Sequence, residues 1–189
     1  MSQERKWLNR CQQGDNEAFS RLYESHVQRI YDYVYFKTYH KETAEDITST
    51  TFMKAFGRIR QFDLRKGEFI AWLYTIAKNE IVDFFRKAHP LLSLEDIWDI
   101  PSSENVEIDV VNRENFKSLQ IYMQKLPACK RDILIMRIWQ DLQFQEIAAI
   151  LKKSEGQCKM IFYRMIKKMK QEVPVNLFLI LMVAKHVIR

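Results

Sequence analysis

The chain has 189 residues, 47% hydrophobic and 29% charged, with 30 lysines and arginines against 24 acidic residues and a net charge of +6. At roughly 150 residues per domain this length allows one domain or two small ones, and only four glycines and four prolines argue against a turn-rich all-β sandwich or barrel. Three irregularly spaced cysteines fit neither a disulfide framework nor a zinc site, and the charged start lacks the apolar region of a signal peptide, so we expect a cytoplasmic chain.

The positive charge suggests an anionic partner, and its distribution along the chain is uneven. The net charges are +3 for residues 1–89, −6 for 90–112, +7 for 113–173 and +2 for 174–189. The acidic stretch holds two prolines and no sustained helical period, so residues 90–114 are predicted to be a linker. Two interpretations of this linker stay open. It is a solvated loop, or it occupies a groove built for nucleic acid, because a string of carboxylates mimics phosphates.

The N-terminal block is predicted to be a helical bundle. Gly14 and Asp15 end one helix and cap the next, which carries one apolar stripe at three- and four-residue steps: Phe19, Leu22, His26, Ile30, Tyr33 and Val34. A second helix opens at Lys41 or Thr43 and faces inward with Ile47, Phe52, Ala55, Phe56 and Ile59. A basic turn at 62–67 leads to a third helix, with Phe69, Trp72, Leu73, Ile76, Ile81, Phe84 and Phe85 inward.

Two features of this block admit a functional interpretation beside a structural one. Glu45 and Asp46 lie at the start of the second helix, where acids complement the helix dipole, and they are equally suited to a partner contact. The second feature mixes aromatic and basic residues: Phe62, Arg65, Lys66, Trp72, Tyr74, Lys78, Asn79, Arg86 and Lys87. Such residues form either a platform for single-stranded bases, with an amide to read a base edge, or part of the core.

The C-terminal block predicts a helix-turn-helix. A helix starts at Leu126–Pro127, residues 144–151 form a short helix, and residues 152–154 turn. A longer helix from Glu155 to Met169, capped by Ser154, then carries Lys159, Arg164, Lys167, Lys168 and Lys170. This arrangement presents its second helix to the major groove; the alternative is an ordinary helical hairpin with a solvated basic face. The expected fold is all-α, with helical domains at 1–89 and 115–172 joined by the acidic linker.

The tail at 173–189 matches no motif. Its eight consecutive apolar residues at 177–184 fall short of the roughly 20 that span a bilayer. The tail is interpreted as a final helix packed on a domain, with docking to an inhibitory partner or loose membrane association as alternatives.

Three sequence motifs, in the same order along the chain, resemble those of bacterial extracytoplasmic-function sigma factors of the sigma-70 family. The first runs from Thr43 to Phe56 and includes Glu45, Asp46 and Phe52. The second runs from Phe69 to Arg86, and the third extends from Leu126–Pro127 through 146–148 to 154–156. The resemblance covers about residues 5–172.

The resemblance implies roles for individual residues. The surface that docks on the coiled coil of the polymerase β′ subunit would contain Glu45, Asp46, Ile47 and Phe52. Opening of the downstream promoter element, with a flipped base held in a pocket, would involve Phe62, Arg65, Lys66, Trp72 and Asn79. Phosphates would be held by Arg58, Arg60, Lys78, Arg86 and Lys87. The upstream element would face Gln157, Lys159, Met160, Tyr163 and Arg164, with the backbone near Lys167 and Lys168.

The implied partners are core RNA polymerase, through its β′ and β subunits, and promoter DNA, with an anti-sigma factor as a further candidate. The linker would thread the polymerase toward its active-site cleft and RNA exit path, which favours the groove-filling interpretation. The leading function is a promoter-specificity subunit, and the alternative is a stand-alone helix-turn-helix regulator. No phosphate loop or nucleophile–base pair is visible and the four histidines lack ligand spacing, so no enzymatic activity, cofactor, metal or small-molecule substrate is expected.

The sequence departs from the family pattern at three places. Ser49 and Thr50 occupy positions where Gln and Glu are usual, which predicts a smaller contact with polymerase. Lys152 and Lys153 replace the Gly and the apolar residue of the turn, and a left-handed residue other than glycine costs on the order of 1 kcal/mol. The recognition helix carries unusual apolar residues at Met160, Ile161 and Ile166, which predicts more methyl contact with thymine and less reading of guanine.

Overall fold

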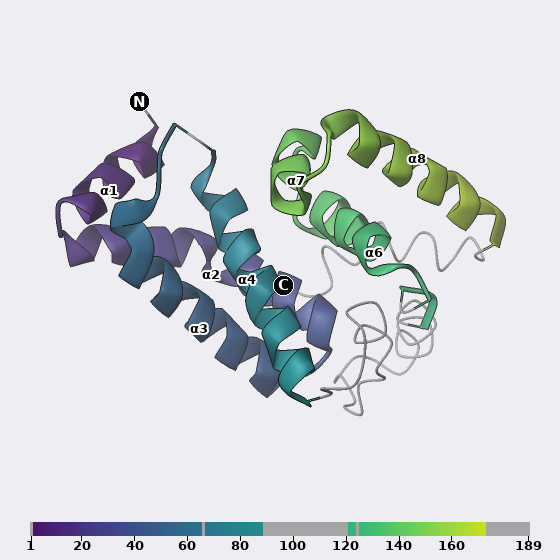
Figure 1. Ribbon diagram of the computed structural model, residues 1–189, viewed down its shortest axis with the longest axis horizontal. Helices are drawn as coiled ribbons and strands as arrows, with labels where there is room; N and C mark the ends of the chain where they lie inside the picture. Colours follow the sequence, from purple (N-terminus) through teal and green to yellow (C-terminus); the bar gives the residue numbers. More distant parts are fainter. Residues whose placement is uncertain (1, 66, 89–120, 124, 173–189) are drawn as a thin grey trace. The chain divides into compact units, whose positions relative to one another are not determined.

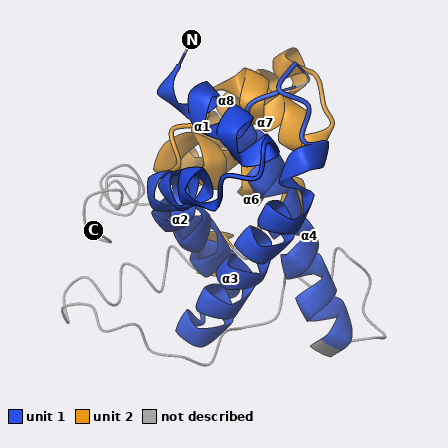
Figure 2. Ribbon diagram, turned by 90° about the vertical axis from the view of Figure 1, so that its left-hand side faces the viewer, with its two compact units in different colours: residues 1–91 blue, residues 92–189 orange. Residues whose placement is uncertain are grey.

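The computed structural model describes residues 2–65, 67–88, 121–123 and 125–172 (Figure 1). Within these residues every regular element is a helix, so the predicted all-α class is confirmed. The chain divides into two compact units, residues 1–91 and 92–189 (Figure 2). The predicted linker at 90–114, the apolar tail at 173–189 and Lys66 lie outside the described residues.

The first unit is a bundle of four helices. Its elements are α1 (Gln3–Gln12), α2 (Asn16–Thr38), α3 (Lys41–Arg58), the short 3₁₀ turn η1 (Ile59–Gln61) and α4 (Phe69–Ala88). Helix α2 packs against α1, α3 and α4, and α3 also packs along α4 (Figure 1). Fully buried side chains from α2 and α4 fill the centre, among them Leu22, Ile30, Tyr33, Leu73, Tyr74 and Ile81.

The helix ends in this unit follow from local capping. Gly14 has a φ of 97°, a backbone conformation that glycine adopts without steric cost, and the Asp15 carboxylate accepts a hydrogen bond from the Ala18 N–H at 3.1 Å. The predicted end of one helix and cap of the next are therefore confirmed. Helix α3 begins at Lys41, one of the two predicted starts, and its cap is His40, whose Nδ1 accepts from the Thr43 N–H at 3.2 Å.

The predicted core of the first unit is correct along α2 and wrong at two aromatic positions. All six residues of the α2 stripe are buried. Phe56 and Phe84, predicted to face inward, are 44% and 39% exposed. Phe56 lies four residues after the buried Phe52, and each such step turns the stripe about 40° around a helix of 3.6 residues per turn. In α4, Ile81 is the last buried residue before Lys87, and Phe84 lies beyond it. Both rings lie at the edge of the bundle.

The second unit contains the predicted helix-turn-helix. Its elements are α6 (Ala128–Leu134), the π-helical segment η3 (Ile135–Trp139), α7 (Phe144–Leu151) and α8 (Glu155–Glu172). Helix α6 packs against α8, and α7 packs against both η3 and α8. The π-helical segment was not predicted. Its helical turn is wider than that of an α-helix, and its residues Ile135, Met136 and Trp139 are all buried in the core.

Candidate nucleic-acid interface

The four residues predicted to dock on polymerase divide into two exposed and two buried. Glu45 and Asp46 are exposed near the start of α3. Ile47 and Phe52 are buried, and the Phe52 ring packs edge-on against Tyr23 with the centroids 4.8 Å apart. Ile47 and Phe52 therefore hold α3 against the bundle, and the acidic pair lies on its outer face.

The outer face of α3 also exposes two large apolar side chains, of which Phe56 was predicted to face inward and Met53 had no predicted role. Met53 is 64% exposed and Phe56 is the exposed ring described above. With Asp46 and the exposed Ser49 they follow at steps of three, four and three residues, which places all four on one stripe. This surface, called here the α3 stripe (Asp46, Ser49, Met53, Phe56), is polar toward the start of the helix and apolar toward its end. The three- and four-residue spacing of these side chains indicates a shared face in the sequence, but Phe56 was predicted to belong to the core.

Three aromatic residues cluster where the α3–α4 turn meets α4. The ring centroids lie 5.1 Å apart for Phe62 and Trp72, 5.6 Å for Phe62 and Phe69, and 5.8 Å for Phe69 and Trp72. Phe62 is only 9% exposed and Phe69 is buried, whereas Trp72 is half-buried. The indole of Trp72 is thus the ring of this cluster that offers surface, and Phe62 supports it from beneath.

Trp72 begins a polar face along α4. Asn79 and Arg86 follow it at seven-residue steps, close to two helical turns each, so the three side chains share one face. Asn79 and Arg86 are exposed, and Arg86 Nη1 lies 3.8 Å from the Asp83 carboxylate. This α4 face (Trp72, Asn79, Arg86) combines an aromatic ring, an amide and a cation, the groups that stack on a base, read its edge and contact phosphate.

The basic residues predicted to contact the downstream element are mostly at the surface. Arg58, Arg60 and Lys87 are exposed, and Lys78 is half-buried. Arg65 is exposed and held by Asp63, whose carboxylate accepts from Arg65 Nε at 3.1 Å and from Arg65 Nη2 at 3.3 Å. This hydrogen-bonded carboxylate raises the pKa of Arg65 above its usual value, so the guanidinium is always charged.

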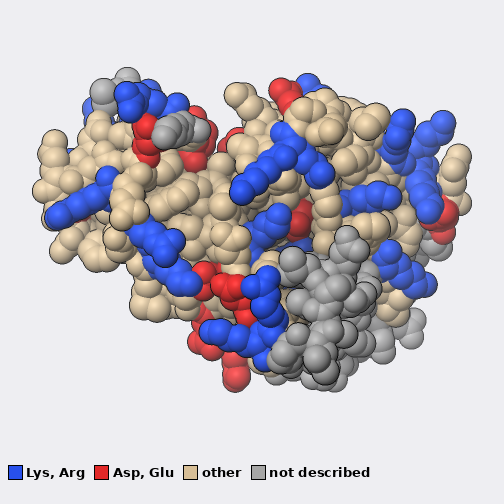
Figure 3. Space-filling view, in the orientation of Figure 1, with Lys and Arg blue, Asp and Glu red and all other residues tan. Residues whose placement is uncertain are grey.

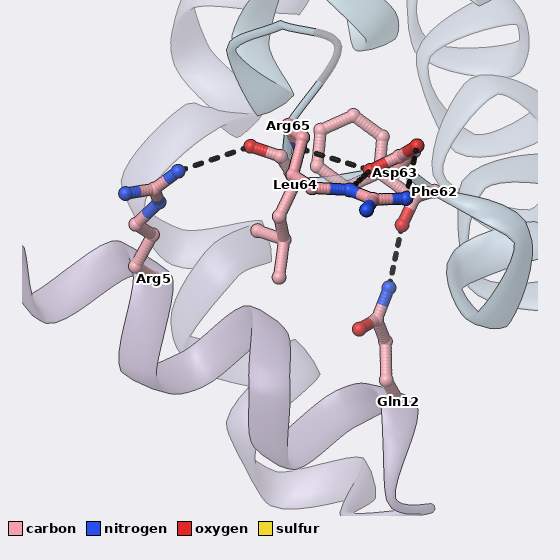
Figure 4. Close-up of polar contacts among 6 residues, drawn as sticks. All are labelled: Arg5, Gln12, Phe62, Asp63, Leu64 and Arg65. Carbon is pink, nitrogen blue, oxygen red and sulfur yellow. Dashed lines mark hydrogen bonds and ion pairs between the residues drawn. The ribbon is translucent and has the colours of Figure 1, made fainter.

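The turn itself is bonded to α1, a contact far apart in sequence. Gln12 Nε2 donates to the Phe62 carbonyl at 2.6 Å, and Arg5 Nη2 donates to the Leu64 carbonyl at 3.1 Å (Figure 4). Both side chains reach the turn from α1, with Asp63 and Arg65 on the opposite side (Figure 4). Sequence patterns gave no signal for these contacts, because they join residues 50 and 59 positions apart.

In the second unit the turn before α8 adopts the conformation that its sequence disfavours. Lys152 ends α7 in the left-handed region, with φ 53° and ψ 47°. Ser154 caps α8 as predicted: its Oγ accepts from the Gln157 N–H at 3.1 Å, and Gln157 Oε1 accepts from the Ser154 N–H at 2.9 Å. This reciprocal cap fixes the start of α8. It also engages the side-chain oxygen of Gln157, one of the predicted readers of the upstream element.

Helix α8 presents the predicted recognition residues to solvent. Its buried side is formed by Cys158, Met165 and Met169, and burial raises the pKa of the Cys158 thiol, which stays protonated as a packing group. The exposed side contains all seven predicted residues: Gln157, Lys159, Met160, Tyr163, Arg164, Lys167 and Lys168. Lysine and arginine side chains gather over α8 (Figure 3).

The exposed side of α8 mixes cations with apolar groups. Lys159 Nζ lies 2.7 Å from the Glu155 carboxylate one turn earlier, so it carries an internal counter-charge. Met160 and Tyr163 are 46% and 63% exposed and lie one turn apart. Near its start, α8 therefore offers a thioether and an aromatic ring beside Arg164.

None of the helices in the described residues has the length and apolar character needed to cross a membrane. Across residues 2–65, 67–88, 121–123 and 125–172, histidine, cysteine and acidic side chains form no group of three that could hold a metal ion.

Taken together, the folds and surfaces define a class: an all-α protein of two units, one bearing an aromatic and basic helix face and the other a helix-turn-helix. The family model of sigma-70 region 2 matches residues 22–90. The ECF RNA polymerase sigma factor BldN of Streptomyces coelicolor is 31% identical over 170 residues, 88% of this chain and 64% of the relative. SigM of Bacillus subtilis, also an ECF RNA polymerase sigma factor, is 27% identical over 150 residues, 79% of this chain and 91% of the relative.

The fold is also shared with a solved structure, that of CnrH in complex with the cytosolic domain of CnrY. The TM-score is 0.69 at 18% identity, over 90% of this chain and 96% of that one. The chain belongs to the sigma-70 family, in its extracytoplasmic-function group. It spans just under two thirds of the length of BldN and about nine tenths of the length of SigM.

Proposed function

We propose that this chain is a dissociable promoter-specificity subunit that binds core RNA polymerase, recognises two promoter elements and assists DNA melting. In this proposal α8 reads the upstream element as duplex, and the α4 face receives a base of the downstream element after it leaves the stack. Unstacking costs a few kcal/mol, which stacking on Trp72 and hydrogen bonds to Asn79 offset. The polymerase supplies the catalysis. Such a subunit works where polymerase and promoters are, in the cytoplasm.

The observation that carries the proposal is the α4 face. A stand-alone helix-turn-helix regulator needs α8 and its neighbours to bind duplex DNA. It has no use for a half-buried tryptophan, an exposed amide and a cation on one face of a helix in the other unit. Those groups suit a single-stranded base, which duplex DNA exposes only when it is opened.

The α3 stripe is the proposed docking surface for the polymerase β′ subunit. Its acidic residue and its two exposed apolar side chains, Met53 and Phe56, would contact a partner helix pair through charge and burial respectively. Ile47 and Phe52, which are buried, would act by holding α3 in place. The β subunit as a further contact and an anti-sigma factor as a regulator stay predictions.

The proposal is tested by separating DNA binding from DNA opening. Asn79→Ala changes an exposed side chain, so the bundle should fold normally. With core polymerase on a promoter selected for the wild-type chain, we expect duplex binding to be retained and permanganate reactivity of downstream thymines to fall. Base preference at one downstream position should fall by roughly fivefold or more, because an amide–base pair contributes about 1–3 kcal/mol.

The matched control is Asn16→Ala, an exposed asparagine at the first residue of α2, which should open promoters as the wild type does. Trp72→Ala should impair opening more strongly, and its thermal unfolding must be measured because the ring is half-buried. If promoter opening is unchanged in Asn79→Ala and in a folded Trp72→Ala, the α4 face does not contact DNA and serves only in packing.

A further inference from the structure

Helix α1 has no assigned role, since the region 2 match starts at residue 22 and α1 ends at Gln12. We propose that α1 is a positioning element for promoter opening: Gln12, supported by Arg5, fixes the α3–α4 turn and through it the indole of Trp72. This inference rests on the proposed function of the α4 face. It concerns a residue that would touch neither DNA nor polymerase.

Gln12 bonds two backbone carbonyls at η1, one of which the end of the helix leaves open. Its Nε2 donates to the Phe62 carbonyl at 2.6 Å and to the Ile59 carbonyl at 3.4 Å. Phe62 directly follows η1, where a helix end leaves carbonyls without partners of its own, whereas the Ile59 carbonyl also accepts the Phe62 N–H at 3.2 Å. The contact is half-buried, so water replaces it only partly.

A second bond holds the turn on the other side of Asp63. Arg5 Nη2 donates to the Leu64 carbonyl at 3.1 Å, and Arg5 lies seven residues before Gln12, on the same face of α1. Within the turn, Asp63 Oδ1 accepts from the Arg65 N–H at 3.0 Å. The backbone from Phe62 to Arg65 is therefore bonded internally and anchored to α1 at two carbonyls (Figure 4).

The anchor itself is firmly placed on the bundle. Leu8 and Cys11 of α1 are buried, and Glu4 Oε1 lies 2.7 Å from Nε2 of His26 on α2. The His26 ring packs beside Phe69, with the centroids 5.7 Å apart. Helix α1 is thus fixed to the elements that carry the aromatic cluster, which gives it the rigidity that a positioning element needs.

The link from Gln12 to Trp72 passes through one residue. The carbonyl that Gln12 holds belongs to Phe62, and the ring of Phe62 packs on Trp72 at 5.1 Å and on Phe69 at 5.6 Å. Movement of the Phe62 backbone moves the ring beneath the indole. Because the half-buried indole is the ring of the cluster that offers surface, its placement determines where a flipped base can stack.

The test compares two adjacent glutamines. Gln12→Met keeps the side-chain length and removes the donor, and Gln13→Met changes the exposed neighbour, for which the described residues show no side-chain hydrogen bond. The first measurement uses the full chain alone: in Gln12→Met the backbone amides of residues 63–65 should exchange hydrogen about fivefold faster, the size expected for one lost hydrogen bond. In Gln13→Met they should exchange as in the wild type.

The second measurement uses the chain with core polymerase on a selected promoter. Gln12→Met should open the downstream element about fivefold less at saturating concentration, with polymerase affinity and upstream-duplex binding unchanged. Arg5→Met, at an exposed position that does not endanger folding, should show a smaller deficit in the same direction.

The possible failures are distinguishable. If the wild type opens no promoter, the proposed function fails. The exchange measurement then still tests whether Gln12 fixes the backbone of the α3–α4 turn. If the wild type opens promoters and both Gln12→Met and Arg5→Met open them equally well, the positioning role is overturned. A loss of polymerase affinity in Gln12→Met equal to its loss of opening would also overturn it, because that result indicates only a weakened fold.

Discussion

The left-handed backbone conformation of Lys152, before α8, allows a quantitative prediction about the stability of the second unit. Lys152 has φ 53° and an exposed side chain, so replacing it with glycine removes backbone strain and little packing. The left-handed conformation costs an L-residue about 1–2 kcal/mol, and glycine loses about 0.5–1 kcal/mol more backbone freedom on folding. Lys152→Gly should therefore stabilise the second unit by about 0.5–1 kcal/mol. The backbone bonds of the turn, such as Lys153 N–H to the Ala148 carbonyl at 3.0 Å, are unaffected.

The neighbouring lysine provides the control. Lys153 is also exposed but does not have a positive φ, so Lys153→Gly should destabilise the same unit by roughly 0.5–1 kcal/mol. Native-state hydrogen exchange of the α7 and α8 amides measures the second unit separately from the first. If both glycine variants destabilise the unit to the same extent, the strain assigned to Lys152 is refuted.

Three further predictions concern the cap of α8, its reading of DNA and the cap of α2. Ser154→Ala removes the acceptor of the Gln157 N–H and should cost about 1 kcal/mol in the same exchange measurement; an unchanged stability would show that the cap contributes nothing. Deoxyuridine in place of thymine in a selected upstream element should weaken wild-type binding by about fourfold, the effect of one buried methyl group, and should not weaken binding by Met160→Ala; an equal loss in both proteins would contradict methyl reading. The Ala18 N–H, and after it Arg10, lower the pKa of Asp15 from its ordinary 3.8. The native state therefore favours the ionised carboxylate, and this contribution to stability is present above pH 3.8 and lost as the pH falls through the lowered pKa. Acid unfolding should show the difference between wild type and Asp15→Asn shrinking over that range, and a constant difference would refute the assignment.

Helix ends and helix faces were predictable from sequence because their causes are local. Gly14, Asp15 and Ser154 are capping residues next to periodic apolar positions, and each caps or ends the predicted helix. Once Ser154 sets the first residue of α8, the helical period alone determines which of its side chains face solvent. The predicted exposure of the recognition residues follows from that register.

The parts that were missed depend on contacts distant in sequence. Whether Phe56 faces inward depends on how far α2 covers α3, which the stripe of α3 alone does not contain. For Phe62 the local pattern left a stacking platform and the core both open, and only packing against Phe69 and Trp72 determines that it is 9% exposed. The bond from Gln12 to Phe62 joins residues 50 positions apart, and no local pattern encodes it.

The central claim is tested most directly by transcription from a randomised promoter library with purified core polymerase and this chain. The account predicts stimulated initiation from templates that share two separated elements, an upstream one read as duplex and a downstream one that becomes permanganate-reactive. Initiation from no template above the level of core polymerase alone would contradict it. Specific duplex binding by the chain without any stimulated initiation would instead identify a stand-alone regulator.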